Sequence, residues 1–125
     1  MKNLEIKEEF IRPGEHRNNK DIESVSMINT MVVFSGGAFE NCSNLDTIYF
    51  GLDITRIGNR TFANCSSLKD VWFAITDKDK IIEIAEDAFD GCEQPITFHI
   101  FASAIDNLSL NRYAKKHGFR VVSMI

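Results

Sequence analysis

The sequence predicts an α/β solenoid, a stack of short coils whose strands form a parallel sheet. Three observations lead to this class: a segment recurs at a nearly fixed period, apolar residues alternate within each repeat, and the C-terminal residues follow the pattern of one helix. A chain of 125 residues is one domain by length, with room for about four or five coils of this period. We therefore expect residues 1–125 to form a single repeat domain.

The repeat is clearest in the segment 38–50, which recurs at 61–73 and, more loosely, at 88–100. The same position of each repeat is a phenylalanine: Phe39, Phe62 and Phe89. These residues are separated by steps of 23 and then 27 residues. A fixed period in this range marks a solenoid, in which each coil touches only its neighbours. A Phe at one phase of successive coils therefore predicts a stacked column in the core.

Alternating apolar residues in each repeat predict the strands of the sheet. The pattern of a half-buried strand occupies 45–50, 68–73 and 98–100, and one period earlier it falls on 21–27. Strands stacked at the same phase in successive coils run parallel. A second apolar pair precedes each repeated Phe: Met31 and Phe34, Ile54 and Ile57, Ile81 and Ile84.

The two ends of the repeat region have the character of caps. Residues 1–21 are expected to form an N-terminal cap, because polar residues such as His16 replace the repeated apolar ones and a terminal coil has one face without a neighbour. A short strand at 4–6 is one option within it. The repeats proper then cover residues 22–100.

Residues 101–125 predict a C-terminal cap made of a helix and a strand. The residues Leu110, Tyr113, Ala114 and His117 share one helical face. Asn107 or Ser109 suits the start of the helix, Gly118 suits its end in the left-handed conformation, and 119–122 alternates as one more strand. A polar insertion at 76–80 is expected on the outer rim, either as a solvated surface loop without a function of its own or as a binding loop.

The three cysteines, Cys42, Cys65 and Cys92, occupy one repeat position each. They have neither the short paired spacing of a zinc site nor the even count of a disulfide framework. We expect a column of buried thiols that pack as small apolar groups. A bridge between sulfurs of adjacent coils is the alternative.

Two segments together resemble the repeats of the BspA-type leucine-rich repeat family. One is 57–73, with Thr-Phe-x-Asn-Cys at its centre and Leu68, Val71 and Phe73 after it, and the other is the Tyr-Ala-Lys-Lys-His-Gly-Phe tail at 113–119. The resemblance covers roughly residues 22–122. It implies a right-handed leucine-rich-repeat solenoid with a parallel sheet on one face. It also implies a protein- or matrix-binding role, often on bacterial surfaces and usually described as adhesion, and it offers no catalytic residues.

Charge and hydropathy exclude several classes of partner. The chain has 14 Lys plus Arg against 18 Asp plus Glu, a formal charge of −4, and its charges are scattered, which argues against a nucleic-acid partner. No apolar run approaches the about 18–20 residues that cross a membrane. The segment 1–9 is charged and lacks the apolar stretch of a secretory signal. The compartment stays open: cytoplasmic, or a segment of a cell-surface or secreted protein.

The outward positions of the predicted strands form the candidate binding face. One row contains Tyr49, Trp72 and His99, preceded by Ser26, and the next row contains Thr47, Asp70 and Thr97, preceded by Ser24. An aromatic row beside hydroxyls and a carboxylate suits recognition of a protein or peptide, with a glycan as an alternative, because Trp and Tyr offer contact area at little entropy cost. The alternative is that Tyr49 and Trp72 are ordinary strand formers that cover neighbouring coils. Arg56 and Glu83 place charge on a different face.

No enzyme, cofactor or metal site is expected. His16, His99 and His117 lie in different coils, the thiols are expected to be buried, and a Cys–His nucleophile therefore lacks both exposure and a base. His99 beside Asp70 is the nearest approach to a catalytic pair. Two functions remain: an interaction module that uses the sheet face, or a structural subunit or fragment that packs against another copy or a larger surface protein.

Overall fold

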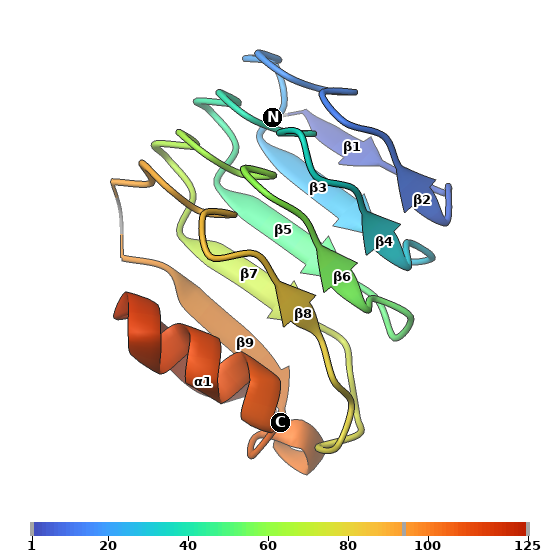
Figure 1. Ribbon diagram of the computed structural model, residues 1–125, viewed down its shortest axis with the longest axis vertical. Coiled ribbons are helices and arrows are strands. Elements are labelled where there is room, and N and C mark those ends of the chain that lie inside the picture. The colour runs from blue at the N-terminus through green and yellow to red at the C-terminus, as the bar shows by residue number, and fades with distance from the viewer. Residues whose placement is uncertain (1, 94, 125) are drawn as a thin grey trace.

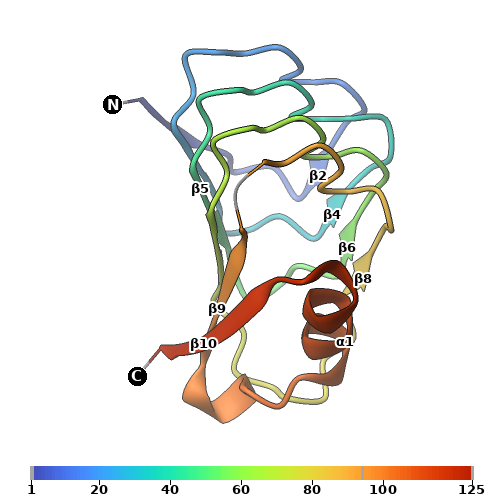
Figure 2. The ribbon, with the colours of Figure 1, turned by 90° about the vertical axis from the view of Figure 1, so that its left-hand side faces the viewer.

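The computed structural model describes residues 2–93 and 95–124 as a stack of coils with two parallel sheets on opposite sides (Figures 1 and 2). The six-stranded sheet has the order β1-β3-β5-β7-β9-β10, and the four-stranded sheet has the order β2-β4-β6-β8. The strands of the larger sheet are β1 Asn3–Glu5, β3 Ser24–Met27, β5 Thr47–Phe50, β7 Asp70–Phe73, β9 Thr97–Phe101 and β10 Arg120–Met124. Those of the smaller sheet are β2 Phe10–Ile11, β4 Val32–Val33, β6 Arg56–Ile57 and β8 Glu83–Ile84. This architecture confirms the predicted α/β solenoid and adds a second sheet that the sequence pattern did not reveal.

Two columns of phenylalanine fill the core between the sheets. Phe39, Phe62 and Phe89 stack face to face at centroid distances of 5.5 and 5.4 Å, and His16 continues this column at 5.1 Å from Phe39. The second column comes from the six-stranded sheet: Phe50, Phe73 and Phe98. These three and Phe39 and Phe62 are almost fully buried. The repeated Phe therefore forms the core column that its period predicts.

Asparagines form a ladder of hydrogen-bonded side chains at the corner where each coil turns back toward the larger sheet. Asn41 and Asn64 adopt left-handed φ angles of 64° and 60°, as does Asn18 at 63°. The amide of Asn64 donates to the side-chain oxygen of Asn41 at 3.1 Å, and Asn41 donates to Asn18 at 2.8 Å. Gly91 ends the ladder, because a Cβ there would lie 2.1 Å from the Asn64 side chain. Asn is the non-glycine residue that tolerates this backbone best, so each coil keeps its corner.

The cysteine column lies beside the phenylalanine column and contains free thiols. Cys42 and Cys65 are buried and Cys92 is half-buried. Each Sγ donates to a carbonyl oxygen of the preceding coil: Cys42 to His16 at 3.2 Å, Cys65 to Phe39 at 3.2 Å and Cys92 to Phe62 at 3.3 Å. The packing role expected for these residues is confirmed. All three are free thiols, so the alternative of a bridge between adjacent coils was wrong.

Residues of the first 21 positions contribute a strand to each sheet. β1 pairs with β3 through the partners Leu4 and Val25, and β2 pairs with β4 through Ile11 and Val33. Ile11 and Val33 are fully buried. The segment expected as an N-terminal cap therefore has the strands of a coil, with β1 at Asn3–Glu5 instead of 4–6.

The smaller sheet follows the predicted apolar pairs at Ile54 and Ile57, which are fully buried, and departs from them in the coils on either side. Val33 is the strand partner of Ile57. In the coil of Val33, the buried residues are Val33 and Thr30, whereas the expected pair, Met31 and Phe34, is exposed. Val33 and Ile57 are 24 residues apart, whereas β3 and β5 of the larger sheet are in register at 23 residues. This difference displaces the apolar pattern by one residue. Ile81 is likewise exposed, and Ile82 is buried in its place.

A C-terminal helix and strand close the stack, as predicted. The helix α1 spans Leu108–His117, after a short 3-10 helix η1 at Ala102–Ala104, and β10 pairs in parallel with β9. Gly118 ends α1 with a φ of 73°. Tyr113 of α1 donates its hydroxyl to the carbonyl oxygen of Ala85 at 2.9 Å, so the helix lies beside β8, as both views show (Figures 1 and 2).

Asn107, one of the two residues considered for the helix start, is the N-cap and also anchors the inserted loop. Its side-chain oxygen accepts from the Leu110 backbone N–H at 3.1 Å, and its amide donates to the carbonyl oxygens of Lys80 at 2.8 Å and Asp77 at 3.3 Å. Asn107 itself is fully buried. The insertion at 76–80 is exposed, yet its backbone is held against the C-terminal cap.

Candidate interaction surfaces

The register of the larger sheet brings the six residues of the expected binding face together. Strand pairing aligns two outward rows across β5, β7 and β9: Tyr49, Trp72 and His99 in one, and Thr47, Asp70 and Thr97 in the other. The apolar residues between them, such as Ile48 and Val71, are buried. The six side chains therefore lie on the outer face of the sheet, in the order that the repeat period predicts.

Within the first row the three rings form a continuous stack. The centroids of Tyr49 and Trp72 are 6.1 Å apart with an interplanar angle of 21°, and those of Trp72 and His99 are 3.7 Å apart with an angle of 8°. Both faces of the Trp72 ring are therefore covered by a neighbour. Tyr49 is 40% exposed, and its other register partner is Ser26, whose side chain is small. The stack presents ring edges to solvent, together with one free face of Tyr49.

A hydrogen bond connects the two rows at His99. Its Nε2 lies 2.8 Å from Oδ1 of Asp70, and the two side chains are 16% and 32% exposed. This contact fixes the imidazole against Trp72. The pair that the sequence suggested as the nearest to catalytic is thus brought into contact, while the thiols lie in the core column.

The hydroxyl row is also tied to its neighbours. Thr47 donates its hydroxyl to Oδ1 of Asp46 at 2.7 Å, and Ser24 donates its hydroxyl to the side chain of Asn3 at 2.7 Å. Because Ser24 and Ser26 have small side chains, the surface over β3 is lower than the Tyr49 ring beside it. The free face of Tyr49 therefore borders a shallow step in the sheet surface.

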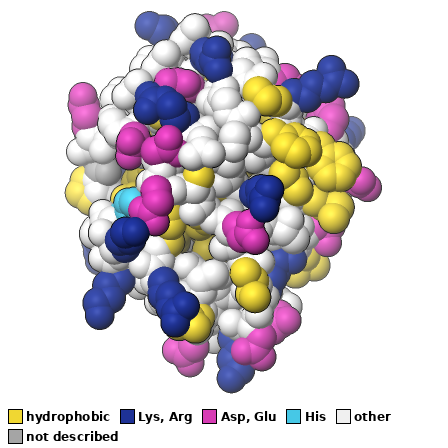
Figure 3. Space-filling view, viewed as in Figure 1, with side chains coloured by type: hydrophobic (Ala, Val, Ile, Leu, Met, Phe, Trp, Pro, Cys, Tyr) yellow, Lys and Arg dark blue, Asp and Glu magenta, His cyan; other side chains and the backbone are white. Residues whose placement is uncertain are grey.

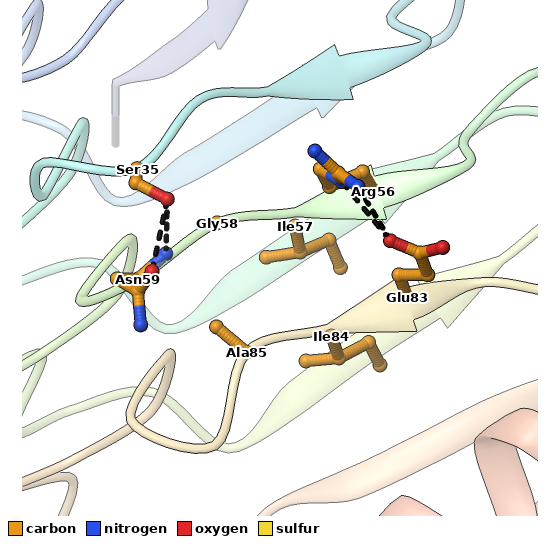
Figure 4. A pocket seen from close by; sticks show the side chains of 8 residues that line it. All are labelled: Ser35, Arg56, Ile57, Gly58, Asn59, Glu83, Ile84 and Ala85. Atoms are coloured by element: carbon orange, nitrogen blue, oxygen red, sulfur yellow. Dashed lines mark hydrogen bonds and ion pairs between the residues drawn. The ribbon is translucent and has the colours of Figure 1, made fainter.

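A hollow on the smaller sheet is a second surface, and the sequence analysis singled out only Arg56 and Glu83 of its residues as surface charges. It has a volume of about 260 Å³ and is lined by Ser35, Arg56, Ile57, Gly58, Asn59, Glu83, Ile84 and Ala85 (Figure 4). Gly58 and Ala85 form its low centre, between the Arg56–Glu83 ion pair at 2.7 Å and the Ser35–Asn59 hydrogen bond at 3.0 Å. The signal for it was the run of small residues beside the charged pair.

Among the residues that the structure describes, no group of three or more His, Cys, Asp or Glu side chains is arranged to hold a metal ion. No helix in the described part of the chain has the length and apolar character needed to cross a membrane. The described surface thus offers ring edges, hydroxyls and a few paired charges, which suit contact with another molecule.

The stacked coils and parallel sheets define the class of repeat solenoids. Six copies of the BspA type leucine rich repeat region match residues 1–119, so the chain belongs to that family. Searches of curated proteins and of solved structures found no match. Leucine-rich repeat domains commonly mediate protein interactions and are typically non-enzymatic.

Proposed function

We propose that this chain is a non-catalytic interaction module that holds a protein or peptide partner on the outer face of its six-stranded sheet. The observation that supports the proposal is the fixed ring stack of Tyr49, Trp72 and His99, flanked by Thr47, Asp70 and Thr97. Rigid aromatic side chains are the usual anchors of protein interfaces, since they bury a large area without losing much side-chain entropy.

At Trp72 the geometry of the stack favours a peptide over a glycan, whereas the free face of Tyr49 suits either. A sugar ring binds an aromatic residue through the open face of the ring, and both faces of Trp72 are covered by its neighbours. The edges of the rings, the hydroxyls and the Asp70 carboxylate suit apolar and hydrogen-bonding peptide groups instead. The free face of Tyr49, beside Ser26, offers room for one apolar or cationic side chain.

A displayed peptide library tests this assignment without a known ligand. The purified chain is immobilised, peptides that bind are enriched, and their affinity is then measured for the parent and for Trp72→Ala. We expect Trp72→Ala to weaken the enriched peptides by roughly thirtyfold or more, the loss typical of an interface anchor. Leu52→Ala is the matched control, because Leu52 is an equally apolar, 56% exposed residue outside the ring stack.

The outcomes separate the classes of partner. Peptides that bind Trp72→Ala as tightly as the parent would place recognition elsewhere and refute the proposal. If no peptide is enriched, the same protein is applied to a glycan array, and binding there would replace the peptide by a sugar. Circular dichroism confirms that each variant keeps the fold.

The second candidate function is that of a structural, self-associating element. A separate observation favours it: large apolar side chains are exposed on the smaller sheet, away from the ring stack.

A further inference from the structure

An apolar patch covers the N-terminal end of the four-stranded sheet. It consists of Phe10, Val32 and Phe34, which we name the β2–β4 patch. Phe10 and Phe34 are 49% and 43% exposed, and their ring centroids are 6.0 Å apart. Val32 is the register partner of Phe10. Hydrophobic side chains gather on this part of the surface in Figure 3, over β2 and β4 of Figure 1. Apolar residues grouped in this way mark an interaction surface more often than single exposed ones do.

Charged residues flank this patch in a definite order along β2. Glu8 and Glu9 precede Phe10, and Arg12 follows it. All three charged residues are exposed, and Glu8, Glu9, Phe10, Arg12 and Phe34 line one open hollow of about 550 Å³. Along the direction of β2 the lining of this hollow therefore reads negative, apolar, positive, and Glu15 lies beyond Arg12, where its carboxylate accepts from the Arg12 backbone N–H at 3.1 Å. Arg56, the strand partner of Val32, already forms an ion pair with Glu83.

This order makes the surface complementary to itself. We propose that the β2–β4 patch binds the same patch of a second copy of the chain, around a two-fold axis that lies in the interface and runs across the strands. Such an axis reverses the direction of β2 in the second copy, so Glu8 and Glu9 of each copy face Arg12 of the other, and the two pairs of phenylalanines pack at the centre. A two-fold axis along the strands would instead place Glu8 against Glu8. Closed two-fold dimers of this kind are the commonest oligomers.

The dimer leaves the outer face of the six-stranded sheet free, because the two sheets lie on opposite sides of the stack (Figure 2). It does not depend on the peptide-binding proposal, and it would present two copies of that face to a partner. Two linked sites can bind a repetitive partner more tightly than one site.

Sedimentation velocity across a range of protein concentrations tests the dimer. We expect the parent to shift from monomer to dimer as concentration rises, and Phe34→Ser to raise the dissociation constant about tenfold or more, since it removes a central apolar contact. Leu52→Ser is the matched control, because it removes a similarly exposed apolar residue outside the patch and should leave the dissociation constant unchanged.

A charge exchange tests the orientation. Glu8→Arg alone and Arg12→Glu alone each place like charges opposite one another, and both should weaken the dimer about fivefold or more. The double variant Glu8→Arg/Arg12→Glu restores opposite charges between positions 8 and 12 across the proposed axis, so it should bind more tightly than either single variant, although Glu9 then faces a like charge. A parent that stays monomeric at every concentration, or a double variant no better than the single ones, would overturn the proposal. Circular dichroism of each variant shows that the fold is retained.

Discussion

Burial sets the chemistry of the cysteine column. Desolvation raises the pKa of the Cys42 and Cys65 thiols, and it raises the pKa of Cys92 to about 11. The thiolate, which is the reactive form, is disfavoured because a charge cannot be solvated beside the stacked rings. At neutral pH only about one Cys92 thiol in ten thousand is ionised. These residues therefore act as packing groups.

Alkylation by iodoacetamide makes this measurable. Because the Cys92 pKa is raised, its labelling rate in the folded protein should rise about tenfold for each pH unit between pH 7 and 10, without levelling off. Cys42 and Cys65, which are fully buried, should stay unlabelled over the same range. In denaturant all three should react at the rate of ordinary thiols. A Cys92 rate that levels off near pH 8.5 would mean that the thiol is not desolvated.

The sequence predicted the outward rows residue by residue, for a physical reason. In a solenoid the register of neighbouring strands follows from the repeat period, so residues 23 positions apart, such as Tyr49 and Trp72, must be partners. The insertion before His99 does not disturb this, since it is accommodated in the loop at 76–80. The period says nothing of ring orientation, and the close stack of Trp72 on His99 is fixed by side-chain packing.

At the scale of elements, the prediction was weaker for the smaller sheet. Each of its strands has only two residues, too few to show an alternation that can be distinguished from a loop. The apolar residues Met31 and Phe34 then suggested the wrong phase, because they are exposed while Val33 is buried. An apolar pattern cannot distinguish a core position from a surface patch, and the patch is where the self-association is proposed.

The contact between α1 and the inserted loop could not be predicted either, because its main anchor is a side chain that serves two elements. Asn107 caps the helix through its oxygen and holds the loop through its amide. A cap motif in the sequence predicts only the first of these roles. The helix and the loop are therefore coupled through the buried Asn107, and Ser109 of α1 adds hydrogen bonds to Lys80 and Ile82.

Asn107→Ala tests that coupling. The substitution removes the helix cap and leaves the carbonyl oxygens of Lys80 and Asp77 without this donor, so we expect unfolding to be easier by ~1–3 kcal/mol. Asn107→Asp is the comparison, because a carboxylate still caps Leu110 but cannot donate to the carbonyls. Hydrogen exchange should then accelerate at 76–80 in both variants, and in α1 mainly in the Ala variant. Unchanged exchange at 76–80 in both would contradict the anchoring role.

At the scale of the whole molecule, the fold is held by a core whose side chains form columns along the stack. Each ring of the Phe39, Phe62 and Phe89 column stacks on the ring of a directly neighbouring coil. Phe62 has ring neighbours on both sides and also contacts Phe50 of the second column at 6.2 Å. Loss of a middle ring therefore separates the two halves of a short array, and neither half has enough coils to be stable alone.

Phe62→Ala should for this reason destabilise the whole chain. A fully buried phenylalanine replaced by alanine costs ~3–5 kcal/mol, since the apolar contacts are lost and a cavity remains. In a domain of this size the loss lowers the melting temperature by roughly 10–20 °C. Trp72 fluorescence reports the larger sheet and far-ultraviolet circular dichroism reports the whole backbone, and the two should give one midpoint. Leu52→Ala, at an exposed site, should melt with the parent. A Phe62→Ala protein that also melts with the parent would show that the column does not hold the coils together, whereas two separate midpoints would show that the coils unfold independently.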